Sequence, residues 1–251
     1  MKSSIFKIGL LFIIVGLLVI SVKAKVSRSV FSDTETQTNN TISTATSFEP
    51  PTADHIVISE VQTTGGTGGG TSKLTDRDFI ELYNPTNLAI NLSGYRVVKR
   101  TGSGVPNDTN VFTFTSSHVI PAHGYFLWAS SESPGFASSI GADVTSSETL
   151  ASSNNSIALR LGPLNIGTII DALSWNPAAF SLKEGTEFSP NPGINESMER
   201  KALSTSTALT MAIGGSDQFR GNGFDSNNNA ADFVLRTLSQ PQNSSSPIEI
   251  P

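Results

Sequence analysis

Hydrophobic and polar residues alternate along several short stretches of the chain. In one of them, Ile80 and Leu82 fall on one face of an extended strand and Glu81 falls on the other, a period of two that is typical of a half-buried β-strand. Asn84 and Pro85 end this stretch, because proline has no N–H for a sheet ladder and keeps the preceding residue extended. The pattern therefore predicts a strand followed by a polar corner.

Comparable β-rich stretches, separated by Gly, Pro, Asn and Ser, recur along the chain and predict an all-β fold. We expect the strands at 78–83 and 95–99 to form a hairpin around the corner at Asn84. Residues 204–223 are expected to be an irregular insertion. The predicted strands are 56–61, 78–83, 95–99, 111–114, 125–129, 156–161 and 168–175.

Composition agrees with a turn-rich β protein, since charged residues make up only 15% of the 251 residues. The net charge is −5, and it becomes −8 if residues 1–24, which carry three lysines and no acid, are removed. A negative charge argues against nonspecific nucleic-acid binding. The absence of cysteine excludes disulfides, thiolate catalysis and thiolate metal sites.

The first 24 residues have the features of an export signal. Lys2 and Lys7 precede an apolar segment at 8–22, which predicts an N-terminal apolar helix. The segment is short for a permanent membrane span, so both a cleaved signal peptide and a retained anchor that contacts the membrane through residues 5–22 stay open.

The rest of the chain divides by composition. Residues 25–54 are rich in Ser, Thr and Asn and predict a disordered, flexible stalk. Residues 55–240 predict one β-sandwich, and residues 241–251 a polar tail.

Four segments carry a resemblance to a known family. IVISEV (56–61), DFIELYNPTN (78–87), INLSGYRV (90–97) and IPAHGYFLWA (120–129) resemble the lamin-tail domain (LTD), in the form found in secreted and cell-surface bacterial proteins. The resemblance implies an immunoglobulin-like β-sandwich and an extracellular or cell-surface location, either secreted or anchored through the N-terminus. It also implies a late strand at 197–201 and a closing turn and strand at 223–235.

A second resemblance covers only the start of the stalk. The segment from Phe31 to Thr36 is similar to the start of mature TasA-like and camelysin-like exported proteins. It supports export.

No stretch carries a recognisable catalytic motif. The glycine-rich segment 65–70 lacks the lysine directly after its last glycine that a phosphate loop needs, because Thr71 and Ser72 precede Lys73. The histidines have no metal-ligand spacing and are expected in turns or at the surface. They are His55, His118 and His123.

Two groups of polar residues are candidate sites. Glu60 and Glu81 are expected on adjacent strands, where they form a structural ion pair with Arg200 or Arg96, or act as a general acid and base. The segment around Asp225 offers oxygens at alternate positions, and so predicts either a structural turn or a weak calcium site. The candidate calcium ligands are Asp225, Asn227, Asn229 and Asp232.

These observations favour a protein that is not an enzyme and has no cofactor, apart from the calcium hypothesis. We expect an exported binding or adhesion module whose partner is an extracellular protein or a cell-envelope polymer. The alternative is an accessory module that localises a separate extracellular hydrolase, such as a nuclease or phosphatase. Tyr95 and Tyr125 are candidates for an exposed binding face, whereas Trp128 and Trp175 are expected in the core.

Overall fold

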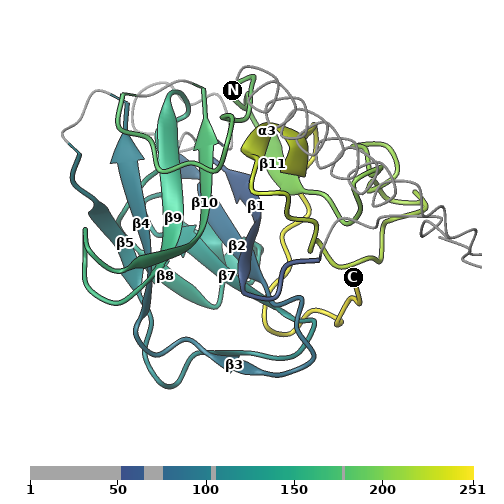
Figure 1. The fold of residues 1–251 in the computed structure, drawn as a ribbon, viewed down its shortest axis with the longest axis horizontal. Helices are drawn as coiled ribbons and strands as arrows, with labels where there is room; N and C mark the ends of the chain where they lie inside the picture. Colours follow the sequence, from purple (N-terminus) through teal and green to yellow (C-terminus); the bar gives the residue numbers. More distant parts are fainter. Residues whose placement is uncertain (1–51, 65–75, 103–105, 177–178) are drawn as a thin grey trace, which may run out of the picture. The chain divides into compact units, whose positions relative to one another are not determined.

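The protein is an all-β domain in which two sheets pack face to face as an immunoglobulin-like sandwich (Figure 1). The computed structural model describes residues 52–64, 76–102, 106–176 and 179–251. The six-stranded sheet has the order β12-β11-β1-β2-β7-β8, and the four-stranded sheet has the order β10-β9-β4-β5. β3 and β6 form a separate short pair.

All seven strands predicted from alternation are present, with ends shifted by at most two residues, and so are the two late strands. The strands are β1 (Val57–Gln62), β2 (Phe79–Tyr83), β3 (Ile90–Asn91), β4 (Tyr95–Thr101), β5 (Thr109–Thr113), β6 (Val119–Ile120), β7 (Tyr125–Ser130), β8 (Val144–Ser146), β9 (Asn155–Leu161), β10 (Thr168–Trp175), β11 (Ser197–Arg200) and β12 (Phe233–Arg236). The described helices are the short α2 (Phe136–Ser139) and α3 (Asn229–Asp232). No helix within the described ranges is long and apolar enough to cross a membrane.

The predicted leader and nearly all of the predicted stalk, residues 1–51, lie outside the described residues. The last stalk residues already belong to the sandwich. Thr52 pairs with Phe224, and the N–H of Ala53 donates to the carbonyl of Gly223 at 2.9 Å.

The core lies between the two sheets. Inward-pointing residues of the two sheets form one core cluster, in which Ile80 and Trp128 from the larger sheet lie with Leu159 and Trp175 from the smaller one. All four are almost completely buried, and each such side chain contributes about 1.5–3 kcal/mol of burial free energy. The prediction that both tryptophans are core residues is confirmed.

The predicted hairpin between β2 and β4 is wrong. These strands belong to different sheets, so the chain crosses the sandwich at the polar corner. The buried side chain of Asn84 holds that corner, since its amide N–H groups donate to the carbonyls of Leu88 at 2.8 Å and Pro121 at 2.9 Å. Alternation identified both strands but carried no information on which sheet each would join.

The predicted polar tail also packs against the domain. We name residues 237–251 the C-terminal strap. The N–H of Glu249 donates to the carbonyl of His123 at 2.9 Å, and the carbonyl of Ile250 accepts from the N–H of Gly221 at 3.1 Å. The N–H of Gln242 also donates to the side chain of Glu81 on β2, so the strap lies against the larger sheet.

Candidate functional site

A buried arginine joins the two sheets. On β11, Met198 and Arg200 point into the sandwich, while Ser197 and Glu199 point outward, as strand alternation requires. The guanidinium of Arg200 binds both carboxylate oxygens of Asp171 on β10, at 2.8 Å each, and neither side chain is exposed. Both contacts come from Nη2, so one nitrogen bridges the two carboxylate oxygens in a fully desolvated ion pair.

Arg200 also binds the backbone on both sides of the pair. Its Nε donates to the carbonyl of Ile58 at 2.9 Å and its Nη1 to the carbonyl of Phe224 at 3.1 Å. The guanidinium lies 4.6 Å from the ring centre of Phe233, a cation–π distance. One side chain thus connects β1, β10, β12 and the turn that precedes α3.

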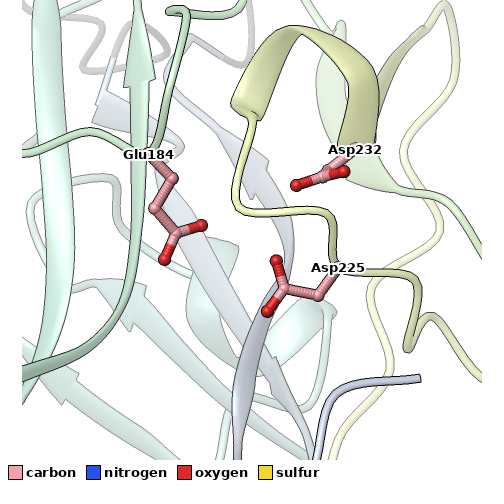
Figure 2. Close-up of side chains that lie close together, drawn as sticks. All are labelled: Glu184, Asp225 and Asp232. Carbon is pink, nitrogen blue, oxygen red and sulfur yellow. The ribbon is translucent and has the colours of Figure 1, made fainter. Parts of the chain in front are cut away.

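Three more carboxylates surround this ion pair. Glu184, Asp225 and Asp232 come from a loop, the turn and α3, and they point toward one another (Figure 2). Ligand oxygens of the three lie within 4.8 Å of one another. Arg200 is 3.4 Å from Asp225 and 3.9 Å from Asp232, so its positive charge is shared among the acids.

Protonation reduces the remaining negative charge. Burial, together with the neighbouring Asp171, raises the pKa of Glu184 to about 9. Burial also raises the pKa of Asp171, although Arg200 opposes that shift. Glu184 is therefore largely neutral at pH 7, which lets it lie beside the other acids.

The four predicted calcium ligands do not all converge. Asn229 is committed to β10, because its Nδ2 donates to the carbonyl of Ala172 at 2.7 Å and its Oδ1 accepts from the N–H of Ser174 at 3.1 Å. Asn227 is exposed and has a positive φ of 56°. Of the four predicted ligands, only the carboxylates of Asp225 and Asp232 lie close together. The third nearby carboxylate is that of Glu184, which comes from a loop distant in the sequence and was not among the predicted ligands.

Local hydrogen bonds show what the two aspartates do in this segment. Asp232 accepts from the N–H groups of Ser226 and Asn228, both at 3.0 Å, and Asp225 accepts from that of Asn227 at 3.1 Å. Carboxylates that cap nearby N–H groups hold a turn. The arrangement thus has the contacts of the predicted structural turn, with Arg200 as its cation.

The outer face of the larger sheet carries a second acidic group. Glu60 on β1 lies directly opposite Glu81 on β2 and Glu199 on β11, so three carboxylates lie side by side across three strands. We call these three residues the carboxylate row. The prediction that Glu60 and Glu81 face each other is confirmed, whereas the predicted pairing of Arg200 with them is wrong, because strand alternation places Arg200 on the opposite face.

The row is buried and holds protons near neutral pH. Burial and the neighbouring Glu199 raise the pKa of Glu60 to about 8. Burial and Glu60 raise the pKa of Glu81 well above its ordinary value. Burial likewise raises the pKa of Glu199 to about 7, although its ion-pair partner Arg236 opposes the shift.

The histidines and the tyrosine candidates have structural surroundings. His118 accepts from the N–H of Thr115 at 3.0 Å, and His123 lies in a turn with φ of 57°. His55 is 3.5 Å from Asp225. Tyr125 is buried, so it is not part of an exposed binding face. Tyr95 is partly buried and packs against the core.

The fold and these contacts define an immunoglobulin-like sandwich module. The family model of the Lamin Tail Domain matches residues 49–177, and the chain belongs to that family. A crystal structure of a DUF4876 family protein from Bacteroides thetaiotaomicron is similar in fold, with a TM-score of 0.50 and 10% sequence identity over 79% of this chain and 74% of that one. No curated protein matches the sequence.

Proposed function

We propose that the protein is an exported, noncatalytic module that binds another protein outside the cell. An apolar surface of exposed side chains carries the proposal. These side chains are Ile213, Phe219, Leu238 and Ile248, with exposed fractions of 69%, 75%, 62% and 59%.

The apolar surface lies over two adjacent hollows. Phe219 and Ile248 line a hollow of about 290 Å³, and Ile213 and Leu238 line another of about 230 Å³. Gln240 lines both, which places the two hollows next to each other. Large apolar side chains gathered around concave surface are typical of protein-interaction sites.

The surface is built by segments that follow the family match. Residues 208–219 and 235–249 both come after residue 177, where the match ends. The matched sandwich therefore acts as a scaffold, and the later loops supply the contact, an arrangement common in binding modules. The export-like leader supports an extracellular location.

The experiment compares two double variants of the protein purified from its native source. Ile213→Ser with Phe219→Ser removes the centre of the apolar surface. Ile166→Ser with Ile169→Ser is the matched control, because these two residues are also exposed but lie in and next to the loop between β9 and β10. Binding to the cell-envelope fraction is measured by quantitative sedimentation.

We expect the first variant to bind at least about tenfold more weakly, since truncating each of two central apolar contacts costs roughly 1 kcal/mol or more. The control should bind like the native protein. Pretreating the envelope with protease should abolish binding. Equal binding by both variants, or binding that survives the protease and so indicates a polymer, would overturn the proposal. A hydrolase as the bound protein would assign the module a localising role.

A further inference from the structure

The C-terminal strap lies directly on the carboxylate row. The backbone N–H of Gln242 donates to Glu81 at 2.5 Å, and that of Gln240 donates to Glu60 at 3.3 Å. The strap also adds a fourth acid, because the side chain of Glu249 accepts from the hydroxyl of Tyr125 at 2.8 Å. The closed strap therefore holds four glutamates in one partly or fully buried group.

Few positive charges face this group. Arg236 forms an ion pair with Glu199. The other nearby arginine, Arg220, lies 3.9 Å from Asp217 and pairs with that acid instead of with the four glutamates. The tyrosines are neutral, since burial raises their pKa values. The titratable and charged groups on the elements packed around the row are Tyr83, Tyr125, Asp143, Asp217, Arg220, Arg236 and Glu249.

We propose that the strap is a proton-controlled latch, closed over the carboxylate row in acidic and neutral media and released as the medium becomes alkaline. The closed arrangement suits neutral carboxyl groups, because four ionised glutamates would face one paired arginine, and two of the four, Glu60 and Glu81, are almost completely buried. Release would let water hydrate each carboxylate.

The direction follows from proton linkage. The pKa of Glu60 rises from 4.5 to about 8 when it is buried, so protonated Glu60 favours the closed strap. The stability that protonated Glu60 gives to the closed strap is fully present below the pKa of Glu60 in the open, hydrated state. It is lost as pH rises through about 8, the pKa of Glu60 in the closed state. The N–H groups of the strap lower these pKa values and offset the burial only in part.

Opening of the strap does not require a partner. It would make binding pH-dependent if the apolar surface proposed above is correct, because Leu238 and Ile248 belong to the strap and would move with it. Strap opening itself is measured without a partner.

The test is native-state hydrogen exchange of the full chain between about pH 5.5 and about pH 8, read by mass spectrometry on peptides from the strap and from β9. After correction for the intrinsic pH dependence of amide exchange, we expect the opening equilibrium of the strap to increase about tenfold per pH unit for each proton released. Protection of β9, in the other sheet, should not fall with the same slope.

Two substitutions sharpen the result. Glu60→Gln and Glu81→Gln keep a hydrogen-bond acceptor but cannot ionise, so each should remove one released proton from strap opening. The opening equilibrium of each variant should therefore increase less steeply with pH, by a factor of about ten per pH unit. Glu187→Gln is the matched control, since Glu187 pairs with Lys183 at the surface, and it should leave the slope unchanged. A strap whose corrected protection does not change with pH would overturn the proposal. So would a β9 slope equal to that of the strap, which would mean global unfolding.

Discussion

Replacing Arg200 by methionine should remove the main polar connection between the two sheets. Methionine keeps an apolar stem that can pack on Phe233, so the variant tests the guanidinium rather than the packing. The substitution deletes two bonds of 2.8 Å to Asp171 and one bond to each of two backbone carbonyls.

The expected cost is about 3–5 kcal/mol in the free energy of unfolding. Breaking a buried ion pair by removing one partner costs about that much, because the other charge stays buried and unpaired. Asp171 keeps its bonds from the N–H groups of Ile58 and Ala172, which limits the loss. For a domain of this size the change corresponds to a fall of roughly 6–20 °C in melting temperature.

The loss should also depend on pH. Without Arg200, burial raises the pKa of Asp171 further, although the bond from the N–H of Ile58 still opposes the shift, so the variant recovers stability where Asp171 is protonated. The deficit should be smaller at about pH 5 than at about pH 8, because stability held by a carboxyl group of raised pKa is lost as pH increases.

Urea unfolding followed by tryptophan fluorescence suits this test, since Trp128 and Trp175 are both buried. The control is Lys183→Met, which breaks a surface ion pair with Glu187 and should cost less than about 1 kcal/mol. An Arg200→Met cost below about 1 kcal/mol, or one equal at both pH values, would refute the reasoning.

Three other predictions concern the corner, the strap and the acidic turn. Asn84→Ala should cost about 1–3 kcal/mol in urea unfolding, because the carbonyls of Leu88, Ile120 and Pro121 lose their donor and that of Ile120 is buried; a loss well below about 1 kcal/mol would contradict that role. Gly221→Ala should raise hydrogen exchange in the strap, since a Cβ there would collide with the hydroxyl of Tyr83 and the carbonyl of Glu249; unchanged exchange would show that the contact relaxes freely. Calcium should leave the melting temperature unchanged, because the positive charge of Arg200, 3.4 Å from Asp225 and 3.9 Å from Asp232, opposes the binding of a second cation there. A rise that chelator reverses and that Glu184→Gln abolishes would instead assign a calcium site.

Much of the sandwich could be predicted from local pattern. Alternation around Ile80 and Leu82 and the block at Pro85 are properties of neighbouring residues, so the strand and its end are visible in the sequence. The sheet that each strand joins cannot be read from neighbouring residues. The choice that sends β2 and β4 to opposite sheets depends on contacts such as those of Asn84 with Pro121, which are distant in the sequence.

The two acidic sites likewise combine features that were predictable from neighbouring residues with features that depend on distant contacts. The facing of Glu60 and Glu81 was predictable because their strands follow one another along the chain. Glu184 had no local signal, since it reaches the acidic turn from a loop. Arg200 and Glu199 are adjacent, and only the phase of β11 decides which of them points inward. A one-residue error in that phase exchanges the two faces, and this explains the mistaken partner for Glu60.

We propose above that the apolar surface contacts a protein outside the cell. The most direct measurement places a photocrosslinking amino acid at Phe219 or at Ile166 of the full chain in cells that naturally produce it. We predict a crosslinked protein adduct from position 219 that added protease removes from intact cells, and none from position 166. No adduct at 219, equal adducts at both positions, or an adduct that protease cannot reach would contradict the proposed function.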